Sequence, residues 1–260
     1  MAREVRIVAD ARALHRAAAD EFARRAKQAV QAQGRFVVAL SGGSTPRGLY
    51  TLLASDQTYR REVPWEKVHL FWGDERHVPP DHPDSNYRMA HEALLAKVPV
   101  PSENTHRLPT ENPSVDEVAR QYEEALRAFF QLSAGQLPRF DLVLLGLGTD
   151  GHMASLFPGT QALHERHKLV VANWVAKLNS YRITLTAPVF NNASCVIFLI
   201  SGEDKALPLK AVVAGKQVPD QLPAQLIRPA DGELLWLVDQ PAGHLLNHIG
   251  SKSGRADHDP

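Results

Sequence analysis

The stretch RFDLVLLGLGTDGHMASLFPG, residues 139–159, decides the fold of this chain. It opens with the apolar run 142–145, which is short enough to be a strand buried on both faces, and then breaks into a glycine-rich loop. The loop carries a carboxylate and an imidazole, Asp150 and His152. Ligands of open α/β sheets lie beyond the carboxyl ends of the strands, so we expect both side chains to face a pocket.

The glycines of this loop, at 146, 148 and 151, match the dinucleotide-binding pattern G-x-G-x-x-G. That pattern needs a long helix after the third glycine and an acidic residue about 20 positions further on. Pro158 and Gly159 end any helix after about one turn, and the sequence around Val171 is apolar. The spacing therefore argues against a dinucleotide site.

Similar apolar runs recur on both sides of this stretch, with helix signals between them. Asp10 caps a helix that stops at Gly34, and Ser114 opens a capping box whose helix runs through Phe130. Because strands alternate with helices along the chain, the pattern predicts a largely parallel sheet that is covered on both faces. The further strands are expected at residues 5–8, 36–40, 68–72, 181–186, 195–200 and 234–238, and the segment 169–174 is apolar.

The run 36–40 is followed by the hexapeptide SGGSTP, residues 41–46. Thr45 is a good helix cap and proline is favoured in the first helical turn, so the loop leads directly into a helix. Exposed N–H groups, the positive end of the helix and three hydroxyls predict a phosphate cradle. No Gly-Lys-Ser/Thr follows, which favours a small phosphorylated ligand over a nucleoside triphosphate. Ser44 as the nucleophile of a G-x-S-x-G elbow is a minor alternative, because Pro46 replaces the last glycine.

Charged residues follow the run 68–72 in the sequence GDERHVPP, residues 73–80. Taken alone, such a segment is usually a solvated loop, but here it lies at the end of a predicted strand. His77 and His82 with nearby aspartates resemble metal ligands. The prolines and the missing ligand periodicity favour a turn that caps a helix over 86–97, so we expect no metal.

Length and charge limit the classes of protein that need considering. The chain has 260 residues and a formal net charge of zero, which gives no sign of a nucleic-acid or membrane surface. Its one cysteine, Cys195, lies in an apolar run and is expected in the core. No signal peptide or membrane-length run is present, so we expect a cytoplasmic protein. We expect one domain over 1–248 and a polar, disordered tail over 249–260.

Six motifs together resemble 6-phosphogluconolactonases, over about residues 5–240 and in the expected order. They are SGGSTP at 41–46, WGDERHVP at 72–79, SNYRMA at 85–90, LLGLGTDGHMASLFPG at 144–159, RITLT at 182–186 and SGEDKA at 201–206. The resemblance implies a three-layer α/β/α sandwich with a mainly parallel sheet, similar to glucosamine-6-phosphate deaminase and ribose-5-phosphate isomerase. It also implies a hydrolase that opens 6-phosphogluconolactone in the oxidative pentose phosphate pathway. The expected ligand is that sugar-phosphate lactone, and no cofactor is expected. The protein is expected to be a monomer or a small homo-oligomer.

Lactone hydrolysis needs an activated water, a stabilised oxyanion and a proton for the departing ring oxygen. His152 is the best base, because an imidazole is largely neutral at working pH. Either Asp150 or Asp74 can orient it, and Arg76 can stabilise an anion or hold the substrate. The family pattern implies that the 41–45 loop, Arg182 and Lys205 hold the phosphate, although the two cations alone would be unremarkable surface charges. The expected site comprises Ser41, Gly42, Gly43, Ser44, Thr45, Asp74, Arg76, Asp150, His152, Arg182 and Lys205.

Two other functions stay open at this level. Amino-sugar phosphate deaminases resemble the chain in the phosphate loop and the Asp-Gly-His turn, but they tend to carry Asn-Glu-Pro where this chain has Ser155 to Pro158. They also tend to have an aromatic residue in place of Arg76, and both departures favour the lactonase. A sugar-phosphate-sensing regulator would need a DNA-binding module, for which the chain offers no room.

Overall fold

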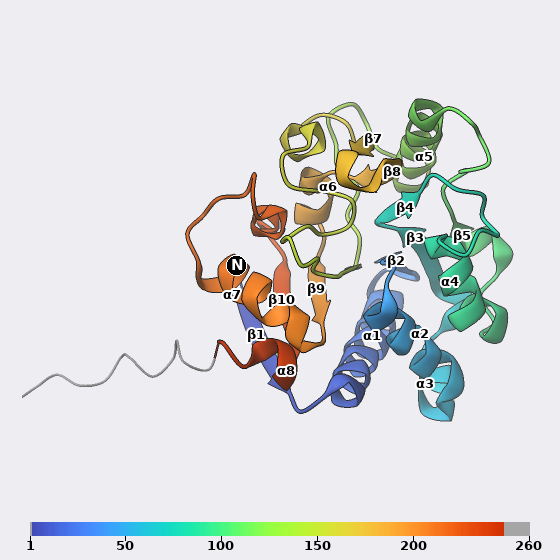
Figure 1. Ribbon diagram of the computed structural model, residues 1–260. Helices are drawn as coiled ribbons and strands as arrows, with labels where there is room; N and C mark the ends of the chain where they lie inside the picture. The colour runs from blue at the N-terminus through green and yellow to red at the C-terminus, as the bar shows by residue number, and fades with distance from the viewer. Residues whose placement is uncertain (1, 247–260) are drawn as a thin grey trace, which may run out of the picture.

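Seven parallel strands form the central sheet of the computed structural model, which describes residues 2–246 (Figure 1). Their spatial order is β1-β10-β9-β6-β2-β3-β5, and every neighbouring pair is parallel. The first strand lies at one edge and, within residues 2–246, pairs only with the last strand of that range. The strands are β1 (Ala2–Val8), β2 (Phe36–Leu40), β3 (Val68–Trp72), β5 (Thr105–His106), β6 (Leu142–Leu145), β9 (Cys195–Ile200) and β10 (Glu233–Asp239).

The chain direction across the sheet reverses between β2 and β6. From β2 the chain proceeds outward to β3 and β5, then returns to β6 on the other side of β2 and continues outward through β9 and β10. Loops that leave neighbouring strands in opposite directions open a crevice at such a switch point. The predicted 41–46 and 146–152 loops leave these two strands, so the topology brings them together.

Helices cover both faces of the sheet, as Figure 1 shows with α1 to α3 on one side and α5 and α6 on the other. The predicted three-layer arrangement is therefore confirmed. The Asp10 side chain caps α1 by accepting a hydrogen bond from the Ala13 N–H, and Gly34 ends the helix in the left-handed conformation. The helices are α1 (Ala11–Gln33), α2 (Ser44–Ser55), α3 (Gln57–Glu62), α4 (Asn86–Ala93), α5 (Val115–Phe130), α6 (Ala187–Asn191), α7 (Ala206–Ala214) and α8 (Gln240–Gly243).

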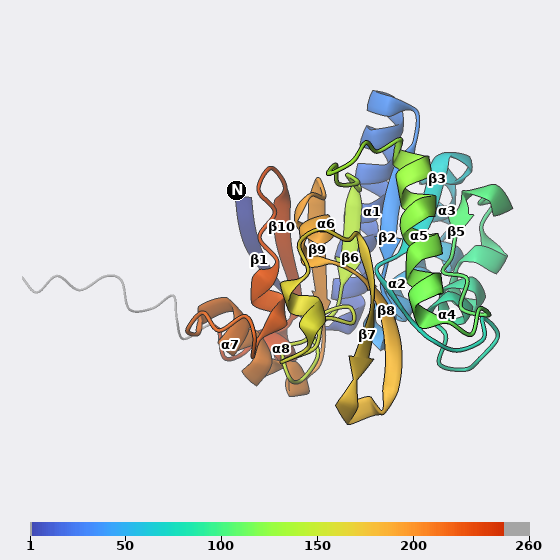
Figure 2. The ribbon, with the colours of Figure 1, turned by 90° about the horizontal axis from the view of Figure 1, so that it is seen from above.

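The structure also contains a second, smaller sheet, which the sequence did not predict. It contains β4 (Asp74–Arg76), β8 (Ser180–Leu185) and β7 (Val170–Val175), all antiparallel, in the order β4-β8-β7. The sequence pattern located β8 and showed that 169–174 is apolar, but it did not indicate a separate sheet and it left 74–76 as a loop. The β7–β8 hairpin extends from the body of the molecule toward the bottom of Figure 2.

The core lies between the parallel sheet and its helices. Every side chain of β2 and of β9 is buried, including that of Cys195, as expected from their continuous apolar runs. Phe198 and Trp236 stack on neighbouring strands with ring centroids 4.0 Å apart. Within residues 2–246, no helix is both long and apolar enough to span a bilayer.

Several expectations lie beyond what the structure describes. The boundary at 248 and the polar tail 249–260 fall outside the described residues. The single domain, the cytoplasmic location and the oligomeric state stay predictions.

Candidate active site

A cavity of about 250 Å³ lies at the carboxyl ends of β2, β6 and β9, where the sheet reverses direction. Nine of the eleven predicted site residues line it, although they come from four separate segments of the chain. Asp150 and Arg182 do not line it but lie next to residues that do. The predicted residues in the lining are Ser41, Gly42, Gly43, Ser44, Thr45, Asp74, Arg76, His152 and Lys205.

The predicted phosphate loop joins β2 to α2, but its cap differs from the expectation. Thr45 does not cap the helix; α2 begins at Ser44, with Gly43 as the N-cap residue and no side-chain cap. The reason is the φ of +103° at Gly43, which turns the chain earlier than a threonine cap would. Helix N–H groups at this end therefore keep no side-chain acceptor and remain available for an anion.

Close packing against the neighbouring helix holds the phosphate loop in place. A Cβ on Gly42 would lie 1.9 Å from Oδ1 of Asn86, so only glycine fits there. Asn86 in turn donates from Nδ2 to the Asp74 carbonyl at 3.0 Å. The Tyr50 hydroxyl accepts from the Ser41 N–H and donates to the Ser41 carbonyl. These contacts join β4 to the phosphate loop.

The loop after β6 forms a tight turn that brings His152 back over its own start. The Gly148 N–H donates to the His152 carbonyl at 2.8 Å, and the Gly151 N–H donates to the Gly148 carbonyl at 3.0 Å. A Cβ on Gly148 would lie 1.9 Å from His152 Nδ1. Gly148, one of the glycines that match the dinucleotide-binding pattern, therefore allows the His152 imidazole to pack against the backbone.

His152 is held by Asp150 and not by Asp74. Its Nδ1 lies 2.5 Å from Asp150 Oδ1, and its ring stacks on Phe157 with centroids 4.1 Å apart. Within residues 2–246 its Nε2 atom forms no hydrogen bond. Burial lowers the pKa of His152, although the Asp150 carboxylate acts in the opposite direction. Burial alone would raise the pKa of Asp150, but hydrogen bonds from Lys177 and His152 outweigh it and lower that pKa to about 2.

The side chains of the charged strand β4 point alternately to its two faces. Asp74 and Arg76 face the cavity; Asp74 Oδ2 accepts from Ser155 Oγ at 2.6 Å, and Arg76 donates to the Asp84 carbonyl at 2.6 Å. Glu75 points the other way and is only 2% exposed. Its carboxylate accepts four hydrogen bonds, from the N–H groups of residues 76, 86 and 87 and from the Ser85 hydroxyl.

Arg182 on β8 lies directly opposite Arg76 on β4, so both project from the same face of the small sheet. Burial lowers the pKa of Arg182, and the nearby Arg76 guanidinium adds to this effect. Like charges in facing positions destabilise a sheet, and here the carboxylates of residues 74, 75 and 84 act on the pKa of Arg182 in the opposite direction. Lys205 lines the cavity from the loop after β9, where it pairs with Asp204 at 2.9 Å.

Four residues around the site were not singled out from the sequence. Asn86 lies in the SNYRMA motif, which was a signal for its segment but not for its role. Ala154 lines the cavity with a φ of +45°, a strained conformation for alanine that no sequence pattern announces. Phe157 and Lys177 contact the His152–Asp150 pair.

The residues that imitate metal ligands have other contacts. His77 Nε2 lies 2.8 Å from the Asn112 carbonyl, and His82 Nδ1 accepts from the Asp84 N–H at 3.1 Å. No group of three or more His, Cys, Asp or Glu side chains within the described part of the chain is arranged to bind a metal.

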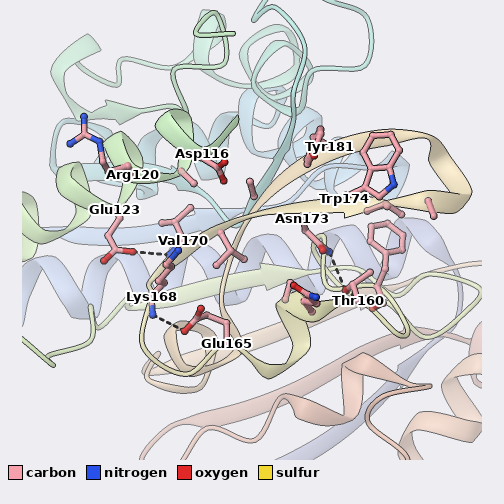
Figure 3. Close-up of a pocket in the computed structure, with 18 of the residues that line it drawn as sticks. Asp116, Arg120, Glu123, Thr160, Glu165, Lys168, Val170, Asn173, Trp174 and Tyr181 are labelled. Carbon is pink, nitrogen blue, oxygen red and sulfur yellow. Dashed lines mark hydrogen bonds between the residues drawn. The ribbon is translucent and has the colours of Figure 1, made fainter. Parts of the chain in front are cut away.

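A larger hollow is a groove of about 1190 Å³ between α5 and the β7–β8 hairpin (Figure 3). Two ion pairs lie among its charged side chains, Arg127 with Glu123 and Arg120 with Glu124. Glu123 also accepts from the N–H groups at the start of β7, and Asn173 donates to Thr160 Oγ1 at 3.2 Å. These contacts attach the hairpin to the body of the protein.

Comparison with known proteins agrees with this fold and shows the family of the chain. Residues 9–236 match the family described as glucosamine-6-phosphate isomerases/6-phosphogluconolactonase. A 6-phosphogluconolactonase of Synechocystis is 47% identical over 85% of this chain and 89% of its own length. One from Nostoc is 44% identical over 94% of this chain and 98% of its own.

A solved structure of similar architecture is the 6-phosphogluconolactonase from Trypanosoma cruzi. It is 28% identical and superposes with a TM-score of 0.82, over 95% of this chain and 98% of that one. Sequence and architecture thus agree over nearly the whole described chain. The chain belongs to the 6-phosphogluconolactonases of the glucosamine-6-phosphate isomerase/6-phosphogluconolactonase family.

Proposed function

We propose that this chain hydrolyses 6-phospho-D-glucono-1,5-lactone to 6-phospho-D-gluconate, the second step of the oxidative pentose phosphate pathway. One observation carries the proposal. A single cavity combines a loop suited to a phosphate with an imidazole whose Nδ1 is held by Asp150 and whose Nε2 has no partner within residues 2–246. The proposed substrate has a phosphate dianion at one end, which suits the loop, and an ester carbon at the other end, which suits the imidazole.

In this proposal, the phosphate binds at the 41–45 loop. The N-terminal N–H groups of α2 and the Ser44 and Thr45 hydroxyls donate to its oxygens, with Lys205 and Arg182 as fixed cations. Arg182 lies opposite Arg76, which lines the cavity, so its positive charge lies beside that lining.

His152 acts as the base. Its Nε2 takes a proton from a water molecule as the water oxygen attacks the lactone carbonyl carbon. Arg76 stabilises the resulting oxyanion. The bond between that carbon and the ring oxygen then breaks, and the imidazolium returns its proton to the departing oxygen. The product is the open-chain acid, which ionises, and the enzyme is restored.

The two carboxylates have different parts in this scheme. Asp150 accepts from Nδ1–H and so selects the tautomer that leaves Nε2 unprotonated. Asp74 anchors the 153–155 segment through Ser155 and places a second negative charge near the imidazolium, which raises the pKa of His152. Asp150 therefore takes the orienting role that the sequence left open between the two.

The test is a side-by-side assay with freshly generated 6-phosphogluconolactone and with glucosamine 6-phosphate. We expect faster loss of the lactone than in buffer alone and no ammonia from the amino sugar. Because the lactone also opens spontaneously, His152→Ala protein purified in the same way serves as the baseline. Ammonia release by the wild type would instead identify a deaminase.

A further inference from the structure

A lysine at the tip of the β7–β8 hairpin contacts the catalytic pair from outside the cavity. Lys177 lies in the single 3₁₀ turn Ala176–Leu178 that joins the two strands, next to Asn179, whose φ is +46°. Its Nζ pairs with Asp150 Oδ2. The same Nζ lies 4.6 Å from the centroid of the Phe157 ring.

Both partners of the His152 ring therefore meet at this one ammonium. Asp150 holds the Nδ1 edge of the imidazole through its other oxygen, Oδ1, and Phe157 stacks on the ring face with an interplanar angle of 24°. Lys177, Asp150, His152 and Phe157 form a closed ring of contacts. Lys177 lines the large groove and is absent from the cavity lining, so its contacts lie behind the imidazole.

We propose that Lys177 is a positioning residue of the lactonase reaction. By binding Oδ2, it turns Oδ1 of Asp150 toward Nδ1 of His152 and so maintains the tautomer in which Nε2 is the base. The inference rests on the proposed function, because it assigns Lys177 a role in that reaction. A carboxylate held on one side only can rotate, and the misplacement of a catalytic group by about 1 Å can cost about 100-fold in rate.

Electrostatics give the same residue a second effect. The charges that act on the imidazole are Asp150, Lys177 and Asp74; the two carboxylates raise the pKa of His152 and the ammonium lowers it. Removal of the ammonium leaves the carboxylates unopposed, so the pKa of His152 rises. Since only the neutral imidazole accepts a proton, activity on the acidic side of the profile is then lost at a higher pH.

A purely structural role predicts a different result. The Lys177 side chain is 49% exposed, and an exposed ion pair adds little to stability. If Lys177 merely attached the hairpin, its removal would lower the melting temperature and would weaken ligand binding through Arg182 on the same hairpin. A positioning role leaves both nearly unchanged and affects turnover.

The experiment compares Lys177→Met, Lys177→Arg and Lys168→Met in the full-length protein. Lys168 is an exposed lysine just before β7 that contacts no site residue, so its variant is the matched control. For Lys177→Met we expect kcat to fall about tenfold or more, with 6-phosphogluconate binding retained and the acidic limb of kcat/KM moved to higher pH. Lys177→Arg should recover most of the rate, and Lys168→Met should behave as the wild type.

Nitrogen NMR of the His152 ring supplies a readout that does not depend on turnover. We expect the wild type to hold the proton on Nδ1 and Lys177→Met to show a mixture of tautomers. A Lys177→Met variant with wild-type rate, pH profile and tautomer would overturn the inference, as would a loss confined to binding and melting temperature. If the wild type itself fails to hydrolyse the lactone, the proposed function fails instead, and the tautomer comparison still decides whether Lys177 orients the ring.

Discussion

The two sheets of this protein contribute to one site in different ways. The parallel sheet contributes loops at its strand ends, namely the 41–45 turn and the turn that carries His152. The antiparallel sheet contributes side chains from within its strands, Asp74, Arg76 and Arg182, and Lys177 at its hairpin tip. In the proposed reaction, the first sheet therefore supplies the base, the backbone donors, Asp150 and Lys205, and the second supplies further charges around them.

The two sheets also differ in how far they are buried. Every residue of β9 is buried, whereas Trp174 and Tyr181 on the hairpin are 45% and 43% exposed. Fewer buried contacts give a segment lower local stability. In this protein, some of the charges around the site therefore lie on an element that is less buried than the parallel sheet. Three changes test this comparison.

The largest expected effect is on the parallel-sheet side. His152→Ala should lower kcat by about 10²–10⁴-fold, the usual contribution of general acid–base catalysis. Binding of 6-phosphogluconate, measured by calorimetry, should stay close to that of the wild type. His167→Ala, an exposed histidine outside the cavity, is the control. Equal losses in binding and turnover would show that the imidazole holds the ligand and does not act as a base.

A change on the antiparallel side should have the opposite signature. Arg182→Ala removes one of the facing cations, and a hydrogen bond to a charged group is worth about 1.5–3 kcal/mol. KM should therefore rise roughly tenfold to hundredfold while kcat changes little, and the rise should shrink at high salt. Arg120→Ala on the exposed face of α5 should leave KM unchanged. A fall in kcat without a change in KM would place Arg182 in the chemical step.

The smallest effect concerns the hydrogen bonds that join β4 to the start of helix α4. In Glu75→Gln an amide NH₂ replaces one carboxylate oxygen, so two of the four donors that bind Glu75 lose their acceptor. An unsatisfied buried donor costs about 1–3 kcal/mol, and denaturant titration should show a loss of that order. Glu92→Gln, on the exposed face of the same helix α4, should leave the unfolding midpoint in place. If both variants were equally stable, β4 would not be held by this carboxylate.

Much of the parallel sheet could be predicted because its signals are local. The runs 36–40, 68–72, 142–145 and 195–200 match the bounds of β2, β3, β6 and β9, since continuous apolar runs between turn residues suit strands buried on both faces. The strand ends, in turn, indicated where the site would lie. The Thr45 cap was wrong, because the propensity of one residue was outweighed by the positive φ of Gly43.

The antiparallel sheet was harder to predict because its pairing is not local. Asp74, Glu75 and Arg76 have no apolar pattern, and they form a strand only because β8, over a hundred residues later, lies beside them. The partner of His152 could not be chosen from sequence either, since Asp74 and Asp150 are both carboxylates after strands. Lys177 carries no signal at all before the hairpin places it against Asp150.

The edge position of β1 has a consequence for how the protein is made. Its only partner in the sheet is β10, near the other end of the described chain. During synthesis on the ribosome, β1 therefore emerges before the other strands of the described sheet and stays unpaired until β10 has also been translated. Pairings between segments so distant in sequence form slowly, and an exposed strand edge can join another chain meanwhile. Chaperone capture of the nascent polypeptide would protect this strand.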